Sequence, residues 1–224
     1  MPAVFVTGAG TDVGKTFVTA GLIRHLRMRG RAVEALKPVV SGFNPLAPSG
    51  SDPAILLEAL GRDVTLRTLA AISPWRFRAA LSPDMAARAE GRAIDFEAVV
   101  RFCAEAATQT SGVLVIEGAG GVMVPIGERH TLLDVMTRLR LPMILVGGSY
   151  LGAINHLLTA EDVLRSRGLD LRAIVVSESR DSTVGLDATG ATLAGFVTAP
   201  QLLLRRADSS GRNENAFARL ADLF

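Results

Sequence analysis

The chain has 224 residues, of which 49% are hydrophobic and 21% are charged, a balance typical of a globular protein with one well-packed core. The formal net charge is only +2, and the arginines are spread along the sequence, which argues against a basic surface for nucleic acid. We therefore expect one domain that spans residues 1–224 and binds no nucleic acid.

The N-terminal sequence MPAVFVTG lacks the charged and apolar regions of a secretory leader, so we expect a cytoplasmic protein. The most apolar stretch, LPMILVGGSYLGAINHLL, is interrupted by Pro142, glycines and polar residues. It is expected to form a strand, a loop and a helix, with no membrane span. The single cysteine, Cys103, lies in the apolar helical pattern FEAVVRFCAEAA and is expected to be a core residue of a reduced protein.

Short β-branched runs alternate with helical patterns along the chain. In chain order, strands are expected at 3–8, 32–40, 113–118, 142–148 and 172–177, and helices from about residue 16, at 95–109, at 154–168 and at 213–224. This order predicts an α/β fold with a mostly parallel sheet that helices cover on both faces. The polar, glycine-punctuated segment 177–195 is expected to be a loop with at most a weak helix.

The segment GAGTDVGKT, residues 8–16, follows the first predicted strand and opens the first predicted helix. This context predicts a phosphate-binding loop of the P-loop NTPase type, although five residues separate Gly8 from Gly14 where four are usual. Backbone N–H groups at the helix start and the ammonium of Lys15 would hold phosphates, and the Thr16 hydroxyl would bind magnesium. A glycine-rich turn that only caps a buried helix is the alternative.

Only two of the 24 lysines and arginines are lysines, Lys15 and Lys37. Lys37 ends the second predicted strand and so lies at the same carboxyl edge of the sheet as the phosphate loop. A compact ammonium fits beside phosphates where a planar guanidinium does not, and Lys37 could neutralise a phosphoryl group during transfer. The alternative is a chance lysine on an exposed strand end.

Two acidic residues could complete a magnesium site, because the ion bound with a nucleotide takes one or two carboxylates besides the loop hydroxyl. Glu117 follows an apolar strand at the ligand edge. Asp52 begins a helix in SGSDPAILLEAL, where a helix N-cap and a metal ligand are equally compatible with the pattern. The three histidines show no metal-binding spacing and are expected to be structural.

Six segments, in this order and at these separations, resemble the dethiobiotin synthetase family: VTGAGTDVGKT, KPVVSG, SD before a helix, SPDMAARAEGR, EGAGG and LGAINH. The resemblance runs to about residue 175. It implies an ATP- and magnesium-dependent reaction in which 7,8-diaminononanoate takes up CO2 as a carbamate. The carbamate would attack the γ-phosphate to form a carbamic-phosphoric anhydride, and the second amine would then close the cyclic urea of dethiobiotin.

The resemblance also implies a homodimer with its active site at the interface, and a role for each matching residue. Lys15 and Lys37 would be catalytic, and Thr16, Asp52 and Glu117 would hold Mg2+. The nucleotide contacts would be Asp12, Val13, Gly14, Lys15, Thr16, Phe17, Asp52, Glu117, Gly118, Ala119, Gly120, Ser177 and Pro200. The substrate contacts would be Thr11, Ser41, Gly152, Ala153, Ile154 and Asn155.

The chain departs from the family pattern in several places. Ser177 stands where an asparagine commonly reads the adenine, Asp84 replaces the histidine of the SPH segment, and the stretch 178–195 is shorter than in many relatives. The main rival class is the partition or septum-placement ATPase, which usually carries a further lysine early in the phosphate loop. A cobyrinate-type amide ligase and a P-loop fold that has lost catalysis are weaker rivals.

Overall fold

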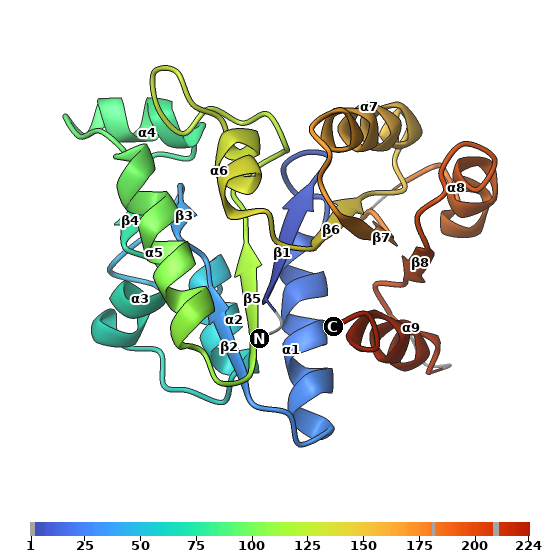
Figure 1. Cartoon of the computed structure of the whole chain (residues 1–224), viewed down its shortest axis with the longest axis horizontal. Coiled ribbons are helices and arrows are strands. Elements are labelled where there is room, and N and C mark those ends of the chain that lie inside the picture. Colours follow the sequence, from blue (N-terminus) through green and yellow to red (C-terminus); the bar gives the residue numbers. More distant parts are fainter. Residues whose placement is uncertain (1–2, 181, 208–210) are drawn as a thin grey trace.

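The structure, a computed structural model, describes residues 3–180, 182–207 and 211–224. Six parallel strands of these residues form the central sheet in the order β2-β5-β1-β6-β7-β8 (Figure 1). The strands are β1 (Ala3–Gly8), β2 (Val33–Leu36), β5 (Val113–Glu117), β6 (Met143–Gly147), β7 (Leu171–Ser177) and β8 (Gln201–Leu204). Their apolar side chains are buried on both faces, as parallel sheets require.

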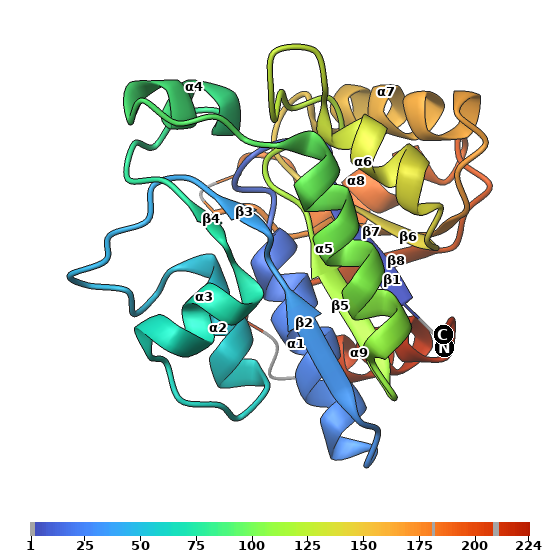
Figure 2. The same cartoon turned by 60° about the vertical axis from the view of Figure 1, so that its left-hand side comes forward.

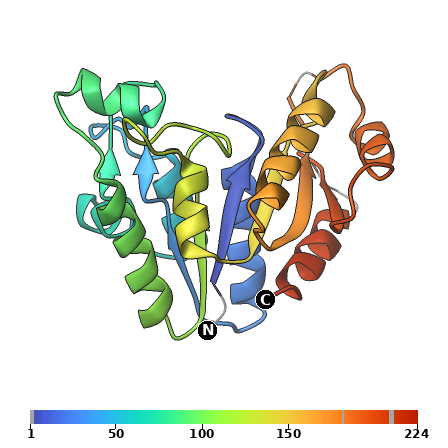
Figure 3. The ribbon, with the colours of Figure 1, turned by 45° about the horizontal axis from the view of Figure 1, so that its top comes forward.

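Helices cover both faces of this sheet, which confirms the expected α/β architecture (Figure 2). One face carries α1 (Lys15–Met28), α2 (Asp52–Ala59) and α9 (Arg212–Ala221), and the other carries α5 (Phe96–Gln109), α6 (Leu132–Leu139) and α7 (Ala153–Ser166). At the β2 side lie α3 (Leu66–Ile72), α4 (Pro83–Ala89) and a small parallel sheet of β3 (Val39–Val40) and β4 (Trp75–Arg76). Figure 3 shows the layers from a second direction.

The strand expected at 32–40 is divided in two. The backbone N–H of Lys37 donates to the Ile72 carbonyl, and Val39–Val40 pairs with Trp75–Arg76 instead of with the central sheet. Pro38 has no N–H group with which to continue the ladder, so the chain leaves the central sheet directly after β2. Lys37 is thereby fixed at the carboxyl edge of that sheet.

The sequence predicts at most a weak helix in the segment 177–195, and the structure corrects this with α8 (Leu186–Leu193). Buried Leu186 and Leu193 anchor the helix, which packs on β7 and β8. Tertiary packing here outweighs the poor helix propensity of its glycine and threonines. Asp181 lies outside the described residues.

The remaining expectations about the core hold. Cys103 is fully buried, and the apolar stretch near residue 145 forms β6, a turn and α7. Among the helices of the described residues, none has both the length and the hydropathy that a membrane crossing demands.

Candidate active site

The phosphate loop connects β1 to α1 and depends on an unusual backbone at its end. Gly14 precedes α1 with φ 93°, in the left-handed region that favours glycine. A Cβ atom on Gly14 would also lie 2.4 Å from Ser177 Oγ. Both the backbone conformation and the neighbouring strand β7 therefore require glycine at this position, which leaves the N-terminus of α1 free to face a phosphate.

Lys15, the first residue of α1, folds back over this loop. Its Nζ donates to the Gly10 carbonyl at 2.7 Å, and a Cβ on Gly8 would come within 3.0 Å of that nitrogen. Burial, reinforced by the charge of Lys37, lowers the pKa of Lys15 to about 8. The ammonium of Lys15 thus bonds a carbonyl of the phosphate loop itself. A phosphate bound in the loop would replace this carbonyl as its partner.

A closed ring of polar contacts joins four side chains, from α1, α2, β5 and the residue that follows β2. Lys37 Nζ lies 2.8 Å from Asp52 Oδ2 and 2.6 Å from Glu117 Oε1. The Thr16 hydroxyl lies 2.9 Å from Asp52 Oδ1 and 2.8 Å from the same Glu117 Oε1. Lys37 also donates to the Gly118 carbonyl at 3.0 Å. Residues 16, 37, 52 and 117, which are far apart in sequence, thus form one cluster at the carboxyl edge of the sheet.

The charges of this cluster stabilise one another. Burial alone would lower the pKa of Lys37, but Glu117 and Asp52 outweigh burial and raise it. Burial alone would likewise raise the pKa of Asp52, but Lys37 and the Thr16 hydrogen bond outweigh it and lower that pKa. The ammonium and the Asp52 carboxylate are therefore both charged at neutral pH.

The donor set fits a magnesium ion. Two carboxylates and a hydroxyl converge, and Mg2+ bound with a nucleotide uses one or two carboxylates and phosphate oxygens. Glu117 is fully buried, and among the described residues its Oε2 has no hydrogen-bond partner, which leaves a carboxylate oxygen available to a cation. Asp52 is the first residue of α2 and Ser51 is its N-cap, so the N-cap alternative for Asp52 does not hold.

A groove of about 1140 Å³ runs across this edge of the sheet. Many of the sequence-predicted residues line it: Thr11, Asp12, Gly14, Lys15, Thr16, Phe17, Lys37, Ser41, Asp52, Ala119 and Gly120. Its volume exceeds the usual range for a single small-molecule pocket, roughly 300 to 1000 Å³, and is sufficient for a nucleotide together with a second substrate.

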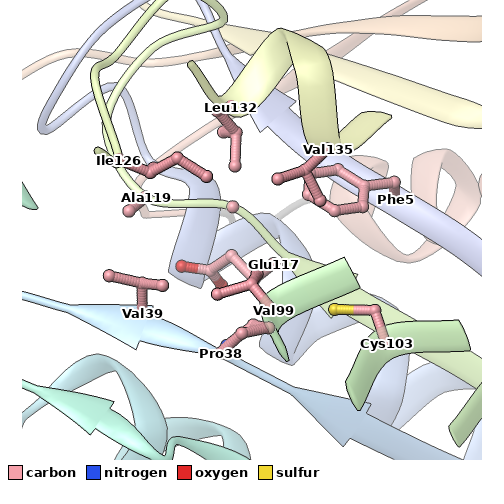
Figure 4. Close-up of a pocket in the computed structure, with 11 residues that line it drawn as sticks. Phe5, Pro38, Val39, Val99, Cys103, Glu117, Ala119, Ile126, Leu132 and Val135 are labelled. Atoms are coloured by element: carbon pink, nitrogen blue, oxygen red, sulfur yellow. The ribbon is translucent and has the colours of Figure 1, made fainter. Parts of the chain in front are cut away.

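Apolar side chains close the site from behind. A cavity of about 10 Å³ lies between Glu117, Cys103 and apolar residues of β1, α5 and α6 (Figure 4). This volume is at the lower limit for one water molecule, and the surrounding side chains other than Glu117 offer no strong hydrogen-bond partner. Glu117 therefore faces an apolar wall on one side and the polar cluster on the other.

Other predicted residues lie outside the groove. Val13 is part of the core, Gly118 contributes its carbonyl to Lys37, and Ser177 is buried beside Gly14. Gly152, Ala153, Ile154 and Asn155 form the start of α7 after β6, at the same sheet edge but without a surface in the groove of this chain.

Pro200 does not line the groove. It directly precedes β8, whose Gln201 pairs in parallel with Ile174, and its carbonyl accepts from the Ile174 N–H. Pro200 therefore lies before β8, level with Val6 of β1, whereas the groove is lined by residues after the carboxyl ends of the strands. The residues that follow β8 at the ligand edge are Arg205 and Arg206.

The structure gives Asp84 a structural role in α4. The Ser82 hydroxyl donates to Asp84 Oδ1 at 2.6 Å, and Arg88 Nη2 lies 2.8 Å from Asp84 Oδ2. Ser82 and Pro83 line the groove, so these contacts fix one wall of it.

Sequence reasoning missed two arginines on the opposite wall. Arg180 and Arg206 follow β7 and β8 and line the groove. Within the part of the chain that the structure describes, no ion pair engages either guanidinium. Their position directly after parallel strands is the signal that the sequence offers, but the sequence does not show where β8 ends.

Comparison with known proteins gives the same family as the motifs. The family described as AAA domain matches residues 2–204. An ATP-dependent dethiobiotin synthetase BioD of Caulobacter sp. strain K31 is 48% identical over 93% of this chain and 90% of that relative. The proteins of the same name from Methylobacterium nodulans and Phenylobacterium zucineum are 50% and 53% identical, over 80% and 81% of this chain and 82% and 78% of their own.

Solved structures are similar in fold at much lower identity. The septum site-determining protein MinD of Pyrococcus horikoshii, complexed with Mg-ADP, has a TM-score of 0.56 at 17% identity, over 99% of this chain and 94% of its own. A ParA family ATPase of Chlorobium tepidum has a TM-score of 0.53 at 14% identity, over 99% and 90%. These likenesses show the P-loop NTPase fold alone. The identity to the named relatives, the variant phosphate loop and the lysine-carboxylate cluster together assign the chain to the family of ATP-dependent dethiobiotin synthetases.

Proposed function

We propose that residues 1–224 form one ligase domain that converts 7,8-diaminononanoate, CO2 and ATP into dethiobiotin, ADP and phosphate. An amine of the substrate adds to CO2 as a carbamate, whose oxygen attacks the γ-phosphorus while ADP leaves. The second amine then attacks the carbonyl carbon of the anhydride, phosphate leaves, and the cyclic urea is closed.

The observation that carries this proposal is the cluster at the carboxyl edge of the sheet. Lys15 and Lys37, the only lysines of the chain, line one groove with Thr16 and Asp52, and the buried Glu117 carboxylate contacts Lys37 from below the groove surface. Phosphoryl transfer needs positioning and neutralisation of charge more than covalent chemistry, and two ammonium groups supply that neutralisation.

Each residue of the cluster then has a defined task. Lys15 and the N-terminus of α1 bind the phosphates, and Lys37 stabilises the negative charge of the phosphoryl group in flight. Thr16, Asp52 and Glu117 would hold Mg2+, which neutralises phosphate charge when it is bound. Thr11 and Ser41 line the groove, and we assign the contacts with the diamine to them.

We further propose that the active site is completed in a homodimer. Gly152, Ala153, Ile154 and Asn155 start α7 and have no surface in the groove of their own chain. Leu151 before them is 84% exposed, so this turn is accessible to a second chain. A partner chain that covers this turn would bring the α7 N-terminus to the substrate carboxylate of the other protomer. Sedimentation of the purified protein as a monomer at all concentrations would contradict this arrangement.

The nucleoside end of the groove differs from the usual family pattern. Ser177 is buried beside Gly14 and is too short to reach far into the groove, whereas Arg180 and Arg206 line it. We propose that these arginines, together with the ring of Phe17, replace the side-chain amide that commonly reads adenine. A cytoplasmic location is also part of the proposal.

The proposed function is tested by phosphate release with Mg2+ and ATP, with and without diaminononanoate and bicarbonate, and again with CTP and GTP. Release only with both diamine and bicarbonate, together with a product of the cyclic urea mass, would support the ligase. Release that is indifferent to the diamine under every nucleotide would contradict it and would favour a switch ATPase that acts through a protein partner.

A further inference from the structure

We propose that in the nucleotide-free protein the ammonium of Lys37 takes the place of the divalent metal, so that Lys37 and the metal exchange on the same carboxylates. Lys37 would then have two positions: a resting one between Asp52 and Glu117, and a working one in the groove after the metal has displaced it. The inference depends on the proposed function only through the use of a divalent metal.

The first argument is that the ammonium and a metal would need the same oxygen atoms. Lys37 Nζ lies 2.8 Å from Asp52 Oδ2 and 2.6 Å from Glu117 Oε1, and the Thr16 hydroxyl bonds to both of these carboxylates. These are the three side chains that fit a magnesium ion, whose ligand oxygens lie at about 2.1 Å. An ammonium left at its present distance from those oxygens would lie a few ångströms from the metal and repel it.

The second argument is burial. Lys37 is 1% exposed and Glu117 is fully buried, so the carboxylate of Glu117 depends on Lys37 for its compensating charge. A buried carboxylate without a partner is strongly destabilising, so some cation must occupy the cluster at all times. Of the described side chains, the ammonium of Lys37 is the cation that bonds to both carboxylates.

The third argument is that the groove offers a second position to the Lys37 side chain after its displacement. Lys37 lines the groove, and so do Lys15 and the start of α1, where phosphates would bind. When a nucleotide carries both metal and phosphate into the groove, the metal takes the carboxylates and the phosphate offers Lys37 a new anionic partner. Charge is then balanced both before and after the exchange, and Lys37 reaches the phosphate only when the metal has arrived.

The test is a titration with Mn2+, followed by electron paramagnetic resonance, on nucleotide-free wild type, Lys37→Gln and Lys15→Gln. Lys37→Gln removes the ammonium from Asp52 and Glu117. It is therefore expected to raise the affinity for Mn2+ by roughly tenfold or more over wild type. Lys15→Gln is the matched control, because it removes the same charge nearby, but among the described residues the Lys15 ammonium donates to the Gly10 carbonyl and to neither carboxylate. We expect it to change Mn2+ affinity by less than about threefold.

Stability gives a second readout that does not require a well-behaved metal-free variant. Lys37→Gln, purified in Mg2+ and then treated with a chelator, is expected to lose thermal stability and to recover it when Mg2+ is added back. Wild type should show no such shift, and adding Asp52→Asn to Lys37→Gln should remove most of it. The exchange would be overturned if wild type and Lys37→Gln bound Mn2+ with equal affinity. It would also be overturned if Mg2+ changed the thermal stability of both proteins equally. Both readouts are independent of ligase activity, so they separate this inference from the proposed function.

Discussion

The two ends of the groove are built in different ways. At the end formed by β2, β5 and α2, four side chains close a ring of short contacts around the buried Lys37. At the end formed after β7 and β8, exposed Arg180 and Arg206 line the groove without ion-pair partners among the described residues. The first end is ordered before any ligand arrives, whereas the second must obtain its partners from the ligand.

This difference matches the work that we assign to each end. Charge that develops on a transferring phosphoryl group must be met by groups that are in place once metal and nucleotide have bound, with Lys37 in its working position, because reorganisation during the step would raise the barrier. A nucleoside needs only to be bound, and contacts formed on binding are sufficient for that. Substitutions at the first end should therefore reduce turnover, and substitutions at the second should reduce nucleotide affinity.

The largest expected effect is at Lys37. Lys37→Ala should lower turnover by about two orders of magnitude or more, because its charge acts chiefly on the transition state. Nucleotide affinity, measured by calorimetry, should remain within a few-fold of wild type. Turnover that is unchanged in this variant would remove Lys37 from the mechanism.

Gly14→Ala should come next. A Cβ at φ 93° would lie 2.4 Å from Ser177 Oγ, so the loop must shift and nucleotide affinity should fall by roughly tenfold or more. Gly168→Ala is a matched control: Gly168 has φ 63°, but a Cβ there would meet nothing within 4 Å. If both variants bound nucleotide as wild type does, the loop would not be the binding element.

Arg180→Ala and Arg206→Ala should have a moderate effect. Each should weaken nucleotide binding by about threefold to tenfold, less so at high salt, with little change in turnover at saturation. The exposed Arg101 on α5 supplies a control substitution far from the groove. A loss of turnover without a loss of affinity would reverse the roles that we assign to the two ends.

The smallest effect concerns the apolar wall behind Glu117. Burial raises the pKa of the Cys103 thiol from 9.0 to about 12, so between these values unfolding releases a proton. The free energy of unfolding should therefore fall by roughly 1 kcal/mol per pH unit in that range through this group alone. Urea titrations of wild type and Cys103→Ala from pH 9 to 10.5 compare the two slopes. Identical slopes would show that the wall admits water.

The sequence is sufficient to place the chemistry at one edge of the sheet. Lys37, Glu117 and the phosphate loop each follow a strongly apolar strand, and parallel strands bring their carboxyl ends together. It cannot reveal that Lys37 bonds to Asp52 and Glu117, because strand patterns predict an edge and not the side-chain contacts made there.

The other end of the groove is harder to predict. The β8 strand is only four residues long, and the sequence QLLLRR does not show where it begins or ends. The family resemblance implies that Pro200 contacts the base, whereas the structure puts Pro200 before β8, outside the groove, and Arg206 after β8, on the groove. The sequence also underestimates the helical character of α8, because the stability of this helix comes from its packing on β7 and β8.

The proposed reaction is tested most sharply with 13C-labelled bicarbonate, diaminononanoate, Mg2+ and ATP, when both the labelled product and the phosphate released are measured. We expect one labelled carbon in a cyclic urea for each phosphate, in wild type and at a greatly reduced rate in Lys37→Ala. Phosphate released without incorporation of the label would contradict the ligase and the role of Lys37 together.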